Sequence, residues 1–256
     1  MPDLTIFQFD LVYNFMSFSV AAMFGSMLFF ILARKEVAPS YRISLILSAV
    51  VVAIAGYHYF RIFQSWAEAY ALQGGEYIAT GAGFNYAYRY VDWLLTVPLL
   101  MAELVLVMKL PDDETKSLLW KLVPAAALMI ALGYPGEVAA EASVKWTWWI
   151  LSMIPFCYIY YVLVAGLTSA KSRQSSKVSS MINTTIALTV IVWLFYPIAY
   201  LLPVLGLDGA TAEVGLQLGN SVADILAKAG YGVLIYFIAR AKSDDDGWSR
   251  DAQVAA

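Results

Sequence analysis

The sequence predicts an all-α membrane protein, a bundle of seven transmembrane helices that forms one domain over residues 1–256. Hydrophobic residues make up 61% of the chain, charged residues only 14%, and the mean hydropathy is +0.68. These values exclude an ordinary soluble domain. Seven apolar segments each have about the length that crosses a bilayer, and they leave little chain for a soluble module.

The seven segments can be justified in order. No basic region precedes the first, which is too long for a signal-peptide core, so we expect a retained helix. The fourth is the shortest. Glycine-rich stretches on both sides of Glu76–Ala79 predict a short hairpin in the second connection, and the polar Lys171–Ser180 stretch predicts a loop. The predicted helices span residues 11–33, 43–65, 85–108, 117–134, 144–167, 179–204 and 214–240.

Basic residues predict the orientation of the bundle. Twelve of the 16 Lys and Arg residues lie in or beside alternate connections and the C-terminal segment. The positive-inside rule then places the N-terminus outside and the C-terminus in the cytoplasm of a multi-pass protein of the cell (inner) membrane. The twelve residues are Arg34, Lys35, Arg42, Lys109, Lys116, Lys121, Lys171, Arg173, Lys177, Arg240, Lys242 and Arg250.

Three other classes of site are not expected. The single cysteine, Cys157, excludes an internal disulfide, and the single histidine, His58, excludes a multi-histidine metal site, so we predict no bound metal. The net charge of −3 changes sign by region, and no surface typical of nucleic-acid binding is present.

Lys228 is the most informative residue, since it lies in the middle of the last apolar segment, one helical turn after Asp224. An ionisable group at membrane depth is costly and marks a functional site by default. A buried lysine can also form a Schiff base. The alternative is a purely structural salt bridge between the two residues.

The third predicted helix carries a second set of polar residues. Asp92, Thr96 and Glu103 fall within about 40° of one another on a helical wheel, and the two carboxylates lie about 16 Å apart along the axis. Arg89, almost one turn outward of Asp92, would help to hold its charge. Two carboxylates on either side of a central amine are typical of a proton relay. The alternative is that these groups only pair with neighbouring helices.

His58 lies among aromatic residues of the second predicted helix. An imidazole beside Asp92 could share a proton with it, and the alternative is a hydrogen-bonded core residue. Aromatic residues on three further helices would provide walls for a rigid conjugated ligand on Lys228. They are Trp93, Trp148, Trp149, Trp193, Tyr196 and Tyr200.

From end to end the chain resembles the microbial rhodopsins, which are seven-helix retinal proteins, and in particular their proteorhodopsin and xanthorhodopsin branch. Long runs in the right order carry this resemblance. They are IAGYHYFRIF (Ile54–Phe63), AYRYVDWLLTVPLL (Ala87–Leu100), GYPGE (Gly133–Glu137), YPIAYLLP (Tyr196–Pro203) and ADILAK (Ala223–Lys228).

The resemblance implies a role for each polar residue. Lys228 would bind all-trans retinal covalently as a Schiff base. Asp92 would be the proton acceptor and main counterion, Asp224 the second counterion and Glu103 the proton donor. His58 would be the partner of the acceptor, with Thr96 and Arg89 supporting the acceptor. The implied retinal pocket consists of Trp93, Leu100, Met129, Gly133, Trp149, Trp193, Tyr196, Pro197 and Tyr200.

Two departures from related proteins matter. Carotenoid-binding members of the xanthorhodopsin branch have a glycine where this chain has Trp149, so we expect no carotenoid antenna of that type. The outer glutamate pair of the archaeal pumps is not evident either, since Leu216 falls where one member is expected. The proton-release group stays open between water near Arg89 and a side chain.

The pattern of Asp92, Thr96 and Glu103 is similar to that of outward proton pumps. The resemblance therefore implies a light-driven outward proton pump, a translocase and not a metabolic enzyme, with protons, internal water and the lipid bilayer as its partners. It further implies a homo-oligomer, with a pentamer favoured. The main alternative is a sensory photoreceptor of the same fold that signals through a membrane partner. A seven-helix receptor or transporter without retinal is the more distant one.

Overall fold

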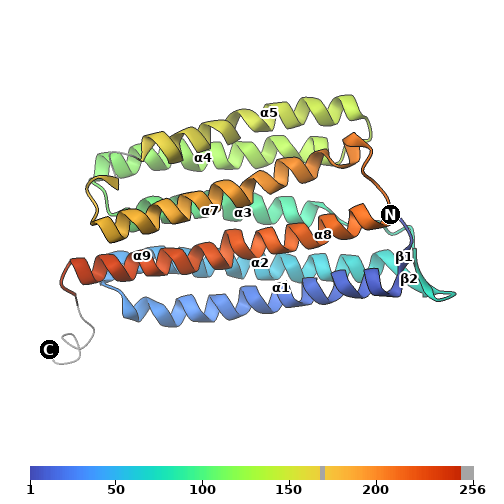
Figure 1. Ribbon diagram of the computed structural model, residues 1–256, viewed down its shortest axis with the longest axis horizontal. Helices are drawn as coiled ribbons and strands as arrows, with labels where there is room; N and C mark the ends of the chain where they lie inside the picture. Colours follow the sequence, from blue (N-terminus) through green and yellow to red (C-terminus); the bar gives the residue numbers. More distant parts are fainter. Residues whose placement is uncertain (168–170, 249–256) are drawn as a thin grey trace.

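A computed structural model describes residues 1–167 and 171–248, so the predicted cytoplasmic Arg250 lies outside the described residues. Long helices lie side by side and run the length of the molecule (Figure 1). Among the described residues, seven helices are long and apolar enough to cross a membrane. The α-helices are α1 (Ile6–Ala33), α2 (Arg42–Ala69), α3 (Ala87–Met108), α4 (Asp112–Glu137), α5 (Ala142–Tyr161), α7 (Ser176–Leu201), α8 (Ala210–Ile225) and α9 (Tyr231–Asp245).

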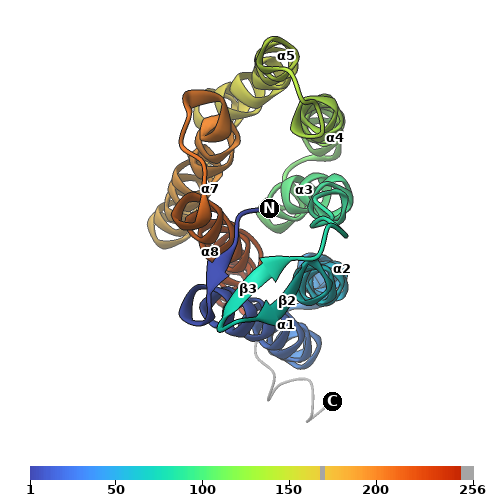
Figure 2. The same ribbon diagram turned by 90° about the vertical axis from the view of Figure 1, so that its right-hand side faces the viewer.

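Two π turns extend these helices. Val162–Gly166 follows α5, and Leu226–Gly230 joins α8 to α9 so that the last membrane span runs over Ala210–Asp245. Short 3-10 turns occupy Arg34–Glu36, Pro39–Tyr41 and Pro203–Leu205. Seen end-on, the helices form a closed ring, and α8 and α3 face each other across it (Figure 2).

Several predicted helix boundaries were wrong. α1 begins at Ile6 and not at residue 11, because Thr5 caps it: its side chain accepts a hydrogen bond from the Gln8 backbone, and the Gln8 side chain accepts one from the Thr5 backbone. α4 extends over Asp112–Glu137, beyond the predicted 117–134. Its first turn is acidic, which favours a helix N-terminus.

The remaining boundaries differ by a few residues. α2 starts one residue earlier than predicted and ends at Ala69, four residues later. α3 begins at Ala87 instead of residue 85, and α5 begins at Ala142 instead of residue 144. The predicted sixth helix, 179–204, is α7, which begins three residues earlier and ends at Leu201, before the 3-10 turn over Pro203–Leu205. The last span extends the predicted 214–240 at both ends.

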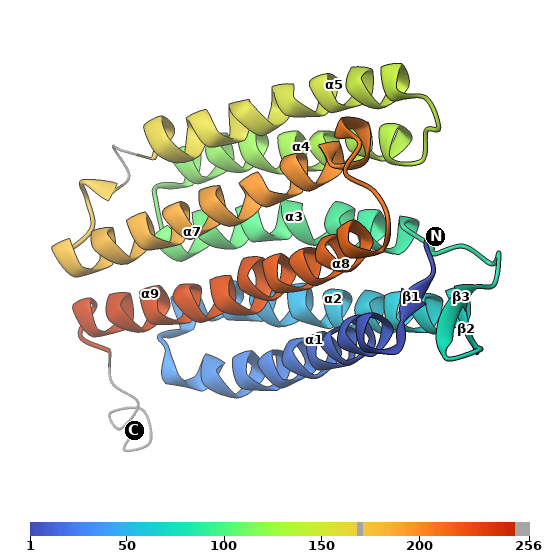
Figure 3. The same cartoon turned by 45° about the vertical axis from the view of Figure 1, so that its right-hand side comes forward.

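The predicted hairpin is confirmed and belongs to a small sheet. β2 (Tyr70–Gln73) and β3 (Glu76–Ala79) are antiparallel, with Gln73 opposite Glu76. Gly74 and Gly75 form the two-residue connection with φ of 62° and 93°, which glycine adopts without strain. β1 (Leu4–Thr5) pairs with β3 as a third strand, which was not predicted from the sequence. The sheet lies at the end of the bundle that also holds the N-terminus (Figure 3).

The helices expose apolar side chains on the outer surface of the bundle and bury their polar side chains inside it. Large apolar side chains such as Leu32, Ile154 and Ile191 are exposed on the outer surface of the helices, as lipid requires. Buried polar and charged residues instead point into the ring. Those that matter below are Ser48, His58, Arg89, Asp92, Thr96, Glu103, Gln217, Asn220, Asp224 and Lys228.

Candidate functional site

Lys228 lies in the π turn between α8 and α9, where the regular helical hydrogen bonding is interrupted. π turns inside helices are frequent at functional sites because they re-aim a side chain. The Lys228 side chain is almost fully buried, with 2% of the residue exposed. A buried amine needs anionic partners, and the structure supplies two.

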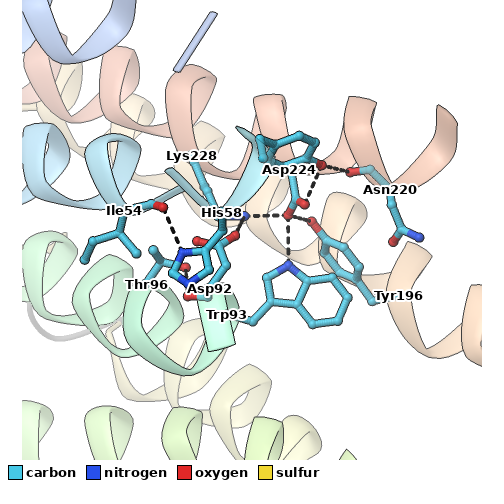
Figure 4. Close-up of polar contacts among 10 residues, drawn as sticks. Ile54, His58, Asp92, Trp93, Thr96, Tyr196, Asn220, Asp224 and Lys228 are labelled. Carbon is cyan, nitrogen blue, oxygen red and sulfur yellow. Dashed lines mark hydrogen bonds and ion pairs between the residues drawn. The ribbon is translucent and has the colours of Figure 1, made fainter. Parts of the chain in front are cut away.

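Both partners are fully buried aspartates. Lys228 Nζ lies 2.5 Å from Oδ1 of Asp224, one turn earlier on α8, and 3.1 Å from Oδ2 of Asp92 on α3. The predicted meeting of Lys228, Asp224 and Asp92 is therefore present in the structure (Figure 4). One positive charge faces two carboxylates, so the three groups form one electrostatic unit.

The two aspartates differ in their hydrogen bonds. Asp224 accepts bonds from the Tyr59 hydroxyl at 2.7 Å, the Tyr196 hydroxyl at 2.8 Å and Trp93 Nε1 at 3.0 Å. Neither carboxylate oxygen of Asp92 has a well-aligned hydrogen bond among the described residues, although Lys228 lies within ion-pair distance of one. Three fixed donors stabilise the anionic form of Asp224, whereas Asp92 remains available to take up a proton.

The neighbours of Asp92 depart from expectation in two respects. The Thr96 hydroxyl donates to the Asp92 backbone carbonyl at 2.8 Å and not to its carboxylate. Arg89 was expected to hold the charge of Asp92, but no ion pair joins the two in the described part of the chain. Its Nη2 instead donates to Gln217 Oε1 at 2.7 Å.

His58 lies on α2, and its ring faces the Asp92 region (Figure 4). Its Nδ1 is 2.9 Å from the Ile54 carbonyl oxygen, a geometry that places the proton on Nδ1. No hydrogen bond between the His58 and Asp92 side chains occurs among the residues described.

Glu103 lies on the same face of α3 as Asp92, about 16 Å further along the helix axis. It is fully buried, and the Ser48 hydroxyl of α2 donates to its Oε1 at 3.0 Å. Leu100, Leu104 and Val107 are buried around it on α3. A carboxyl group in such apolar surroundings favours its neutral, proton-carrying form.

A cavity of about 130 Å³ extends from Lys228 between α3, α4, α5 and α7. This space suits an organic group and is far larger than a single water molecule needs. All nine residues of the implied retinal pocket line it: Trp93, Leu100, Met129, Gly133, Trp149, Trp193, Tyr196, Pro197 and Tyr200.

The walls of this cavity fit retinal. They are mainly aromatic and aliphatic, as a conjugated apolar chain requires, and the only buried lysine of the described chain lies at one end. Trp149 is fixed by a 3.0 Å bond from its Nε1 to the Pro197 carbonyl oxygen. Gly133 leaves room beside Tyr90, whose ring would lie 3.3 Å from an added Cβ.

Four further polar residues of the site were not predicted from the sequence. Tyr59, Ser48, Gln217 and Asn220 are buried and contact or adjoin the residues above. A buried tyrosine or serine in an apolar helix has no distinctive sequence signal, because such residues are common on packed helix faces. The role of each residue becomes visible only from its contacts with a neighbouring helix in the structure.

In the described part of the chain, seven helices that can span a membrane surround a buried lysine with two aspartates on its amine and an aromatic cavity beside it, the arrangement of a membrane protein with an internal ligand site. Comparison with known proteins gives the family. The profile of the bacteriorhodopsin-like protein family matches residues 11–242, and the chain belongs to this family, within the proteorhodopsin and xanthorhodopsin branch. It is a multi-pass membrane protein.

Individual relatives agree with this assignment. The chain is 32% identical over 226 residues to the green-light absorbing proteorhodopsin of Gamma-proteobacterium EBAC31A08, covering 88% of this chain and 85% of that one. Its structure matches that of xanthorhodopsin, described as a light-driven ion pump with dual chromophore. The TM-score is 0.94 at 55% identity, over 97% of this chain and 100% of the other. A thermophilic rhodopsin matches with a TM-score of 0.93 at 48% identity, over 97% and 100% of the two chains.

Proposed function

We propose that this protein is a light-driven outward proton pump that carries all-trans retinal on Lys228 as a Schiff base. The observation that carries the proposal is the unequal pair of buried aspartates on one amine, together with a second buried carboxyl group further along the same helix face. The description of xanthorhodopsin as a light-driven ion pump supports it.

When bound, retinal supplies light absorption and an isomerisation that changes the position and proton affinity of the Lys228 nitrogen. Asp92, 3.1 Å away, accepts the proton of that nitrogen, because its carboxylate has no fixed donor among the described residues. Asp224 stays anionic, since Tyr59, Tyr196 and Trp93 hold it. Its charge keeps the site favourable for the next proton.

Glu103 then returns a proton to the Lys228 nitrogen from the other side. Its apolar surroundings keep it protonated at rest, and the Ser48 hydroxyl orients its carboxyl group. Buried apolar residues of α3 such as Leu100 lie between Glu103 and Asp92, so the group that returns the proton is separated from the group that accepts it, and the transfer has a direction. Glu103 is also what argues against the sensory alternative, because a sensor does not need rapid reprotonation from the cytoplasm.

We further propose that the N-terminus faces outside and the C-terminus faces the cytoplasm of the cell membrane. The connections between α1 and α2, α3 and α4, and α5 and α7, together with the end of α9, carry most of the basic residues used for this prediction, and they lie at the end of the bundle opposite the β-sheet (Figure 1). Protons and internal water are the proposed partners within the membrane. We keep a ring-shaped homo-oligomer, with a pentamer favoured, as a proposal from family resemblance alone.

Trp149 lies where a carotenoid antenna would contact the retinal in related proteins. Its indole lines the cavity and is bonded to Pro197, which supports the proposal that no carotenoid antenna seats there. The relative with a dual chromophore gives this absence no support. We expect wild-type protein with added carotenoid to show no carotenoid bands in the fluorescence excitation spectrum of retinal, and Trp149→Gly to be the variant that can gain them. Energy transfer in the wild type would contradict the proposal.

The pump is tested in an unbuffered suspension of cells that express the chain with all-trans retinal. Illumination should acidify the medium, and a protonophore should abolish the change. Asp92→Asn should keep a visible pigment but lose acidification. Alkalinisation that grows with protonophore would show that another ion is moved, and a visible pigment without any pH change would favour the sensor.

A further inference from the structure

The cavity that holds Lys228 continues past Arg89 toward the sheet end of the bundle and reaches Glu137, the last residue of α4. Glu137 and Lys228 thus line one continuous space. The chemistry derived above gives Glu137 no role. A carboxyl group at the outer end of a cavity that begins at a proton-carrying nitrogen is placed to pass on that proton.

The contacts of Glu137 leave its carboxyl group able to exchange a proton. Tyr90 donates its hydroxyl to Oε2 at 3.2 Å. Lys145 Nζ donates to the Glu137 backbone oxygen at 3.3 Å, so this cation is held on the main chain and not on the carboxylate. The side chain is half-buried and therefore reaches both the cavity and outer water. The charged and titratable groups that act on Glu137 are Arg89, Lys145, Glu213, Tyr86, Tyr90 and Tyr200.

Arg89 provides an independent observation at the same place. It is 3% exposed and lines the cavity, yet its Nε has no hydrogen-bond partner among the described residues. One bond to Gln217 anchors it, and Gln217 Nε2 in turn donates to Glu213 Oε1 at 2.8 Å. A buried cation with an unpaired N–H group responds to the charges on either side of it, which are the inner aspartates and Glu137.

Glu213 is less suited to proton exchange. Its carboxylate accepts from Gln217 and, at 3.3 Å to each oxygen, from the Tyr86 hydroxyl. Burial, followed by the charge of Glu213, raises the pKa of Tyr86 well above its usual range, so this hydroxyl remains a donor. Glu213 does not line the cavity. These contacts indicate that Glu213 fixes Gln217, which in turn accepts the hydrogen bond from Arg89.

We infer that Glu137 is the carboxyl group through which the pumped proton leaves the protein. The inference rests on the proposed pumping function. Glu137 carries a proton at rest in this scheme. When Asp92 has gained the proton of the Lys228 nitrogen, the negative charge of Asp92 is lost, and Arg89 then favours the anionic form of Glu137. The O–H bond of Glu137 breaks, and its proton passes to outer water. The proton of Asp92 later moves outward and restores the neutral Glu137, so one proton leaves per cycle.

The test follows proton release after a laser flash. Wild-type pigment, Glu137→Gln and the matched control Glu141→Gln, an exposed glutamate at the same end, are reconstituted with retinal and a pH-sensitive dye. We expect Glu137→Gln to delay acidification of the dye about ten-fold or more, with proton uptake by Asp92 unchanged, because one acid–base group is lost. Light-minus-dark infrared spectra should show a carboxyl C=O change in wild type and Glu141→Gln that is missing in Glu137→Gln.

The possible results distinguish a failure of the Glu137 assignment from a failure of the proposed pumping function. A wild type without dye acidification or net pumping contradicts the proposed function. A wild type that pumps, with release in Glu137→Gln as fast as in wild type, overturns the role of Glu137 alone. Delay in Glu213→Gln but not in Glu137→Gln overturns it as well and assigns the exit to Glu213. If Glu137→Gln forms no pigment, Glu137→Asp replaces it, and release unchanged by the shorter side chain counts against the inference.

Discussion

Asp92 and Asp224 show how two identical side chains on one amine acquire different chemistry. Both are fully buried and both face Lys228. Three hydrogen-bond donors fix Asp224, whereas Asp92 has only the nearby amine among the described residues. A group that must gain and lose a proton benefits from few fixed donors, since each donor stabilises the anion. The proposed roles, Asp92 as proton acceptor and Asp224 as permanent counterion, are supported by this difference in hydrogen bonds.

Replacing Lys228 with alanine tests the attachment of the chromophore. We expect Lys228→Ala to abolish the visible absorption band of the retinal-reconstituted protein, because no other buried lysine of the described chain lines the cavity and the bond to retinal needs an amine. Lys121→Ala, at an exposed position, is the control and should keep the band. A visible band that survives in Lys228→Ala would favour a receptor or transporter without retinal.

Replacing Glu103 with glutamine tests the proton donor. Glu103→Gln keeps the bond to Ser48 but cannot release a proton, so late photocycle decay should slow by about 100-fold or more and lose its pH dependence. Flash photolysis over a pH series measures both effects. Glu114→Gln, in the first turn of α4, is the control. Decay in Glu103→Gln that matches the wild type would remove Glu103 from the relay.

The polar face of α3 was predictable, while its partners were not. Helical periodicity alone brings Asp92, Thr96 and Glu103 to one face, and the structure buries all three. The carboxylate of Asp92 and the hydroxyl of Thr96 do not meet, because the hydroxyl bonds the backbone within its own helix. The partner that each side chain on this face bonds depends on its rotamer and on the neighbouring helices. The spacing of residues in the sequence gives neither.

The ends of the elements were the least predictable part of the fold. Hydropathy locates seven spans, but α1 starts earlier than the apolar pattern, because the capping box of Thr5 and Gln8 continues the helix through polar Asp10. β1 is only two residues long, and its pairing with β3 depends on chain segments more than seventy residues apart. The π turn at Lys228 was not predictable either, since Leu226, Ala227, Lys228 and Ala229 are good helix formers and a single glycine, Gly230, does not distinguish a π turn from an α-helix.

Replacing Gly136 with alanine tests whether the close approach of α4 to α7 stabilises the protein. A Cβ at this position would lie 1.9 Å from the Tyr200 hydroxyl and 2.8 Å from Trp148 Cβ, so Gly136→Ala must displace both side chains. It should destabilise the protein by about 1–3 kcal/mol, as overpacking of a core does. Thermal loss of the visible band should then occur at a temperature lower by about 2–4 °C for each kcal/mol.

Gly25 of α1 provides the matched control, because an added Cβ there meets no atom within 4 Å. Gly25→Ala should leave thermal stability unchanged or raise it slightly, since alanine favours the helix. Equal thermal stability of Gly136→Ala and the wild type would show that Tyr200 moves aside at no cost, and that the contact does not hold the helices.

At the scale of the whole molecule, charge is arranged along the axis of the bundle. Basic residues gather at the end where α9 finishes, where Arg173 pairs with Glu114, and Lys109 and Lys242 lie 5.4 Å and 5.6 Å from the centre of the Tyr41 ring. The opposite end holds the β-sheet and the Glu137 and Glu213 carboxylates. This asymmetry was predictable from the sequence, because the positive-inside rule uses only the connection in which each basic residue lies. The sequence could not bring Glu137 to the cavity that contains Lys228, since that requires the packing of α4 against α3.

This asymmetry makes the membrane orientation testable with cysteine labelling. Cys157 is the only cysteine of the chain, so Cys157→Ser provides a background without thiols. In this background, Gln73→Cys in the exposed hairpin should react with a membrane-impermeant maleimide on intact cells. Lys177→Cys, exposed at the start of α7, should react only after the cells are broken, because it belongs to the basic end. The reverse pattern would place the N-terminus in the cytoplasm, and Glu103 would then face outside. Light would in that case have to move protons inward through the same residues, which the sign of the pH change in the cell suspension would reveal independently.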